Sequence, residues 1–124
     1  MDSIRNSLIS KAFILPTGEI SKDKINLFSG AVTPPFAETI WVMTDGDMDA
    51  VNRMTSLFTK LLDDGQEQVF MDTLRLLYDV MGLQFPEDME MLSDHPEARQ
   101  YFLFSFLLDI DDCMQDFTSE AAGE

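Results

Sequence analysis

The fold is decided by residues 96–117, which read PEARQYFLFSFLLDIDDCMQDF. Apolar side chains recur there at steps of three and four, which places them on one face of an α-helix. They are Phe102, Phe106, Ile110, Cys113 and Phe117, widened by Leu103, Leu107 and Met114. Over residues 101–108 the apolar character extends almost all the way round, so this segment is either a central core helix or half core and half partner surface.

Two further amphipathic helices are predicted before this one, over residues 47–62 and 66–82. Asp47 is placed to cap the first of them, and Gly65 lies just beyond its end. Gly82 occupies the position of a left-handed cap at the end of the second. Together with the helix over residues 96–117, the sequence predicts three amphipathic helices.

The first third of the chain predicts a small strand region. Residues 11–15 (KAFIL) lead into a turn over residues 16–19 (PTGE), which has proline and glycine where a β-turn needs them. Residues 39–43 (TIWVM) are β-branched and aromatic enough for a strand. Residues 33–35 (TPP) are expected to be extended, because proline lacks an N–H and restricts the residue before it.

Two readings remain open for the residues after the turn. In the first, Ile20 starts a returning strand. In the second, which is favoured, Ser21 caps a short helix that runs as far as Phe28. We therefore expect an α+β, mainly α, fold in which three amphipathic helices pack with a small N-terminal strand or hairpin region. A single acidic globular domain is expected over residues 1–118, followed by a frayed acidic tail over residues 119–124.

Charge is distributed very unevenly along the chain. The 124 residues include 8 basic and 23 acidic side chains, for a net charge of −15. Residues 1–62 carry 6 basic and 7 acidic side chains, and residues 63–124 carry 2 and 16, so the second half alone has a charge of −14. Such a field repels nucleic acid and anionic lipid and attracts basic surfaces. We expect no direct nucleic-acid binding and a protein partner with a basic or apolar surface.

Composition also limits compartment and cofactors. One Cys and one His exclude an internal disulfide framework and are too few for a structural zinc site. The N-terminus lacks the apolar stretch of a secretion signal, and no apolar run approaches the roughly 20 residues that cross a bilayer. A cytoplasmic location with no membrane contact is expected, and the oligomeric state is left open.

Few residues favour catalysis or metal binding. Asp45, Asp47 and Asp49 match the start of a calcium loop, but Ala50 stands where that loop needs glycine and Ser56 where it needs glutamate. The lone His95 precedes a proline at a helix start, and Cys113 falls on the apolar stripe. We therefore expect no enzyme activity, no cofactor and no metal.

The function favoured by these features is a non-enzymatic, acidic protein-protein interaction module. It would bind a basic or aggregation-prone partner, as an assembly or secretion-type chaperone or a masking inhibitor. Three aspartates would supply charge, and the exposed members of an apolar set would supply the anchors. These residues are Asp109, Asp112 and Asp116, with Phe102, Phe104, Phe106 and Met114. One alternative is a DNA mimic that occupies the nucleic-acid site of an enzyme, and another is a small carboxylate-dependent hydrolase or metal-binding protein.

Overall fold

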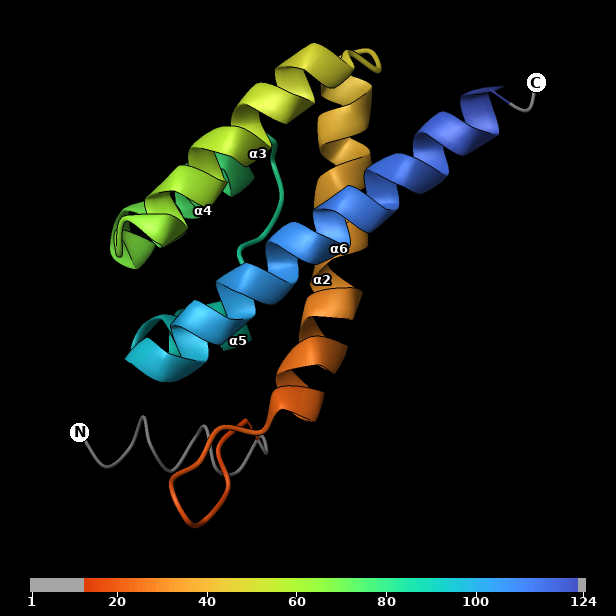
Figure 1. Ribbon diagram of the computed structural model, residues 1–124. Coiled ribbons are helices and arrows are strands. Elements are labelled where there is room, and N and C mark those ends of the chain that lie inside the picture. Colours follow the sequence, from red (N-terminus) through yellow and green to blue (C-terminus); the bar gives the residue numbers. More distant parts are fainter. Residues whose placement is uncertain (1–12, 123–124) are drawn as a thin grey trace.

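The computed structural model describes residues 13–122, where five helices follow one another (Figure 1). They are α2 (Lys22–Met43), α3 (Met48–Asp63), α4 (Glu67–Val80), α5 (Glu87–Ser93) and α6 (Pro96–Ala122). The helices α3 and α4 form an antiparallel hairpin, and α6 crosses α2 in the middle of the molecule. Because α6 also packs against α3, α4 and α5, it is the central helix of a bundle.

The expected α+β fold is wrong, because the described residues contain no strand. What remains of the N-terminal hairpin is one isolated antiparallel bridge between Ile14 and Ile20. The turn between them is present: Gly18 has a φ of 95°, and its N–H donates to the carbonyl of Leu15 at 2.8 Å. The start of the first expected strand, residues 11–12, lies outside the described residues.

A single long helix replaces the second expected strand. Residues 33–35 and 39–43 both lie inside α2, which Ser21 caps and which runs far past Phe28. Its buried residues recur at helical spacing on the face that packs against α6. They are Ile25, Ser29, Thr33, Phe36, Ala37 and Ile40. Burial of this face outweighs the β-propensity of residues 39–43.

The two prolines of α2 are tolerated because they lie on its solvent side. Pro34 and Pro35 are exposed, as are Gly30 and Ala31, whose carbonyl groups lose their usual donors. Water can bond to those carbonyls, so the cost of the missing N–H groups is small compared with an interior position.

The three helices predicted in the second half are confirmed. Asp47 caps α3 by accepting from the backbone N–H groups of Asp49 and Ala50 at 3.0 and 3.3 Å. Gly65 and Gly82 adopt φ values of 74° and 71° after α3 and α4. The third helix, α6, continues to Ala122, and α5 adds a short helix before it.

A continuous chain of aromatic rings runs through the core. Phe28 of α2 contacts Phe102 at 5.5 Å between ring centroids, Phe102 contacts Phe106 at 5.7 Å, and Phe106 contacts Phe36 at 5.2 Å. Phe36 in turn stacks on Tyr78 of α4 at 5.4 Å. The apolar segment 101–108 therefore has one side in the core.

A matched pair of alanine substitutions tests this division of α6. Phe106→Ala removes a fully buried ring and should lower the free energy of unfolding by about 3–5 kcal/mol. Phe104→Ala removes a ring that is 52% exposed and should cost less than about 1.5 kcal/mol. Urea unfolding followed by circular dichroism measures both, and equal losses would contradict the assignment of Phe106 to the core.

Tyr78 carries a buried hydroxyl for which the described residues offer no hydrogen-bond partner. Its side chain is 4% exposed, between Phe36 and Phe85. Burial disfavours the charged phenolate and raises the pKa of Tyr78 to about 12. The hydroxyl thus costs desolvation without an internal hydrogen bond in return.

Tyr78→Phe should therefore leave stability at neutral pH unchanged or raise it by about 1 kcal/mol. In the wild type, the unfolded chain ionises Tyr78 near pH 10, whereas the folded chain keeps its proton to about pH 12. Folding stability should then fall by about 1.4 kcal/mol per pH unit between these values, relative to Tyr78→Phe. Urea unfolding of both proteins at neutral pH and across this interval measures the difference. If the free energy of unfolding changed equally with pH in both proteins, the hydroxyl would be solvated.

Candidate functional site

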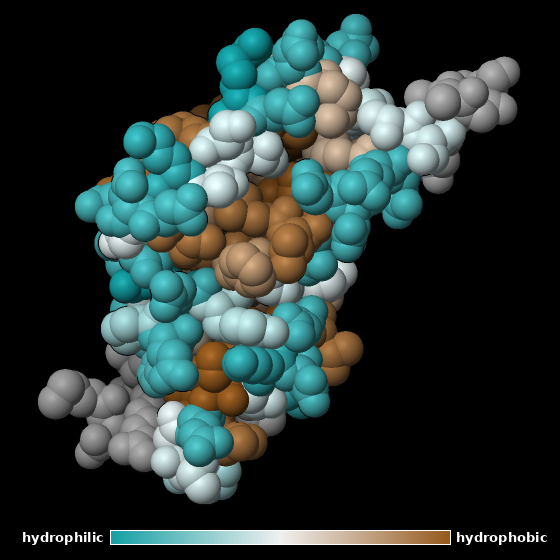
Figure 2. All heavy atoms as spheres, in the orientation of Figure 1, coloured by the Kyte–Doolittle hydropathy of each residue, from teal (hydrophilic) through white to brown (hydrophobic). Residues whose placement is uncertain are grey.

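An apolar groove lies between α3 and α6. Phe104 and Leu108 are four residues apart on α6, and each is 52% exposed, whereas the other apolar side chains described on this helix are buried or half-buried. With the partly buried Leu62 and Leu107 they line a hollow of about 630 Å³, whose remaining lining comes mostly from α3. Figure 2 shows hydrophobic residues gathered between these two helices, with hydrophilic residues on both sides.

The groove continues toward the start of α6. A second hollow of about 530 Å³ shares Leu62, Asp63 and Phe104 with the first and extends to Ile20 and Tyr101. Phe104 therefore lies at the junction of the two hollows. Together they form one elongated surface rather than a closed cavity.

Acidic side chains line the edges of this groove. Asp63 and Asp111 lie on opposite sides of the first hollow, and Glu97 lies at the second. Lys60 borders the first hollow and Lys22 the second; the ammonium of Lys60 is 3.7 Å from a carboxylate oxygen of Asp64, and that of Lys22 lies over the ring of Tyr101. The groove therefore combines apolar side chains of α6 and Leu62 with the hydroxyl side chains of Thr55, Ser56 and Thr59 on α3, and carboxylates outnumber ammonium groups at its rim.

Only one of the four predicted apolar anchors is exposed. Phe102 and Phe106 are fully buried and Met114 is 3% exposed, so these three belong to the core. Phe104 alone reaches the surface, where Leu108 accompanies it.

The three predicted aspartates do not form a continuous row. Asp112 and Asp116 are exposed, but Asp109 is half-buried and accepts a hydrogen bond from the hydroxyl of Ser29 at 2.5 Å. This contact joins α6 to α2 and uses the charge of Asp109 inside the protein. Asp111, which lines the groove, is the aspartate of this cluster that meets the exposed apolar residues.

A polar cluster joins α4 to α5. The guanidinium of Arg75 donates to Glu90 at 2.8 and 3.1 Å and to Asp72 at 2.6 Å, and it lies over the ring of Phe85. The hydrogen bond from Arg75 lowers the pKa of Glu90, and the bond to Glu90 raises the pKa of Arg75. Arg75 joins α4 to α5 through Glu90, while Asp72 and Phe85 contact its guanidinium, so we assign this cluster a structural role.

The groups considered for chemistry have local structural roles. His95 accepts from the backbone N–H of Ala98 through Nδ1 at 3.2 Å and so caps α6. Burial, followed by the charges of Asp109, Asp116 and Asp112, raises the pKa of the Cys113 thiol, which makes it a poorer nucleophile.

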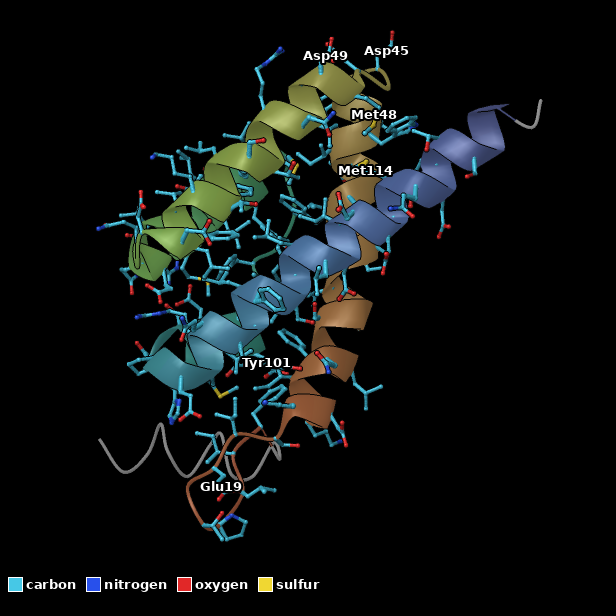
Figure 3. All side chains as sticks on the ribbon, viewed as in Figure 1. Glu19, Asp45, Met48, Asp49, Tyr101 and Met114 are labelled. Carbon is cyan, nitrogen blue, oxygen red and sulfur yellow. The ribbon has the colours of Figure 1, made fainter. Side chains whose placement is uncertain are left out.

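The acidic turn between α2 and α3 does not assemble a calcium loop. The side chains of Asp45 and Asp49 point outward there (Figure 3), while Asp47 is engaged as the α3 cap. Within residues 13–122, no group of three or more His, Cys, Asp or Glu side chains is arranged to hold a metal ion.

Comparison with known proteins gives no relative: no protein-family model, curated protein or solved structure matches this chain. In the described region, no helix is long and apolar enough to cross a membrane. The cytoplasmic location stays a prediction.

Asp109 and Asp112 provide a test of structural against surface carboxylates. Asp109→Ala should lower the free energy of unfolding by about 1–3 kcal/mol, because it leaves the buried hydroxyl of Ser29 without its charged acceptor. Asp112→Ala changes an exposed residue and should alter stability by less than about 0.5 kcal/mol. Urea unfolding measures both, and an unchanged free energy of unfolding in Asp109→Ala would show that the contact with Ser29 adds no stability.

Proposed function

We propose that this chain is a non-enzymatic protein-interaction module whose α3–α6 groove binds a basic amphipathic segment of a protein partner. Such a module acts as an assembly or secretion-type chaperone, or as an inhibitor that masks the segment. The observation that carries the proposal is the half-exposed pair Phe104 and Leu108 in an apolar groove with an acidic rim.

The shape of the groove fits a helical segment. Two helices, α3 and α6, form its walls, and its two hollows meet at Phe104. An amphipathic helix presents apolar side chains at positions i, i+3 or i+4, and i+7, which is about 10 Å along its axis. One such side chain can enter each hollow, with Phe104 between them. Aromatic residues at the centre of a contact carry most of its binding energy.

The charge of the groove favours basic residues on that segment. Asp63, Asp111 and Glu97 are placed to meet lysine or arginine side chains beside the apolar contact. The excess acidic charge of residues 63–124 adds long-range attraction, which raises the rate of encounter. Apolar contact supplies affinity, and charge supplies orientation and speed.

The DNA-mimic alternative depends on acids presented in regular rows. Two of the carboxylates that could contribute already have partners in the protein: Asp109 accepts from Ser29, and the exposed Glu90 pairs with Arg75. A mimic would also bind through charge alone, without an apolar centre. The groove therefore favours the interaction module over the mimic.

Titration with a synthetic amphipathic helix of leucine and lysine, about four turns long, tests the proposal by calorimetry and NMR chemical shifts. The peptide should bind with shifts concentrated along α3 and α6. The double variant Phe104→Ala/Leu108→Ala should weaken binding by about 30-fold or more, because it removes the apolar centre. Leu27→Ala is the matched control, since Leu27 is 69% exposed on α2 and outside the groove.

Two further peptides separate the competing functions. A leucine–glutamate helix should bind much more weakly than the leucine–lysine helix, because it meets the acidic rim with like charge. A lysine peptide without leucine should bind weakly and be lost at high salt. Equal binding by the lysine peptide, with no dependence on Phe104, would contradict the groove proposal and support mimicry.

A further inference from the structure

Helix α4 carries a second apolar surface, and none of its residues lines the groove. Val69, Leu76 and Val80 are 45%, 64% and 65% exposed. With the half-buried Thr73 they follow one another at steps of four, three and four. This is the spacing of the a and d positions that form the seam of a coiled coil.

The two flanks of this seam differ in character. In this heptad, Thr73 and Val80 are a positions, and Val69 and Leu76 are d positions. Phe70 and Leu77 then occupy the e positions, and Asp72 and Asp79 the g positions. Phe70 stacks on Phe58 of α3 with 4.5 Å between ring centroids, so the e flank faces α3. The g flank is exposed and acidic.

Helix α3 carries two exposed basic residues within about one turn of these acidic positions. Arg53 and Lys60 are both exposed and lie seven residues apart, on the same side of the helix. The contact between Phe58 and Phe70 fixes the register of the antiparallel hairpin. We count from this contact in opposite directions along the two antiparallel helices. Arg53 then lies level with about residue 75 of α4 and Lys60 with about residue 68, and each is roughly one turn from an acidic g position.

We propose that this surface is a dimer interface, in which α4 packs parallel to α4 of a second copy around a two-fold axis along the seam. The axis places Leu76 against Leu76 and Val80 against Val80. It also turns the acidic flank of each copy toward α3 of the other copy at the same height. Asp79 then lies within about one helical turn of Arg53 of the second copy. Asp72 lies at a similar distance from Lys60 of the second copy, but within their own chain Asp72 already bonds to Arg75 and Lys60 to Asp64.

Charge selects this partner and this direction. An antiparallel seam would lay α3 over α3 and bring Arg53 and Lys60 against the same residues of the other copy. The parallel seam brings Asp79 of each copy toward Arg53 of the other, so opposite charges face one another on both sides of the apolar contact. Asp79 has no ion pair among the described residues, so it is available for this contact.

Sedimentation equilibrium and light scattering over about a hundredfold range of concentration test the dimer. The wild type should dimerise, and Leu76→Glu should weaken dimerisation at least 10-fold, because it places two carboxylates in the seam. Leu27→Glu on α2 is the matched control and should remain dimeric, since Leu27 is 69% exposed, close to the 64% of Leu76, but lies off the seam. Circular dichroism checks that each variant is folded. A monomeric wild type, or a dimer indifferent to Leu76→Glu, overturns the proposal.

A charge exchange tests the parallel arrangement. Arg53→Glu and Asp79→Arg should each weaken the dimer several-fold, and the double variant should recover most of the loss because the pair is restored in the opposite sense. No recovery in the double variant overturns the parallel seam. Phe104→Ala should leave the dimer intact, so failure of the groove proposal and failure of this one are distinguishable.

Discussion

The packing of α2 against α6 is the contact on which the rest of the structure depends. Phe28 and Phe36 of α2 meet Phe102 and Phe106 of α6 in one line of rings, and Ser29 reaches across to Asp109. With α6 fixed in this way, α3, α4 and α5 can all pack against the remaining sides of a single helix. The surface that α6 leaves uncovered, around Phe104, is therefore set by where α2 lies.

The sequence predicted the second half of the fold well and the first part poorly, for one physical reason. In α3 the apolar face, the Asp47 cap and the following glycine agree, and in α4 the apolar face and the following glycine do, so local signals suffice. In α2 the local signals favour extended structure at residues 33–35 and 39–43, and only the burial of Thr33, Phe36 and Ile40 against α6 makes the segment helical. That contact joins residues some 70 positions apart, and a reading of local pattern cannot supply it.

Prediction of the site was limited in the same way. The sequence leaves the segment 101–108 as either core or half core and half surface, and the structure buries Phe102 and Phe106 while it exposes Phe104. Leu62 and Asp63 could not be added from the sequence, because nothing in it shows which helix lies beside the free face of α6. The steps of four and three from Phe104 to Leu108 and Asp111 were a usable signal, since they mark an apolar and acidic strip away from the core stripe.

The two apolar surfaces differ in the charges around them, and this separates their proposed partners. A second copy in the groove would bring Asp63 and Asp111 against an equally acidic chain, so the groove favours a basic occupant. On the α3–α4 hairpin, by contrast, Arg53 and Lys60 lie within about one turn of the heights of acidic residues, which permits like chains to associate. Lys60 borders the groove as well as the dimer surface, but no α4 residue lines the groove, so both surfaces can be occupied at once. A dimer of this kind would present two acidic grooves and could hold two basic segments of the same partner, which strengthens binding without any new contact.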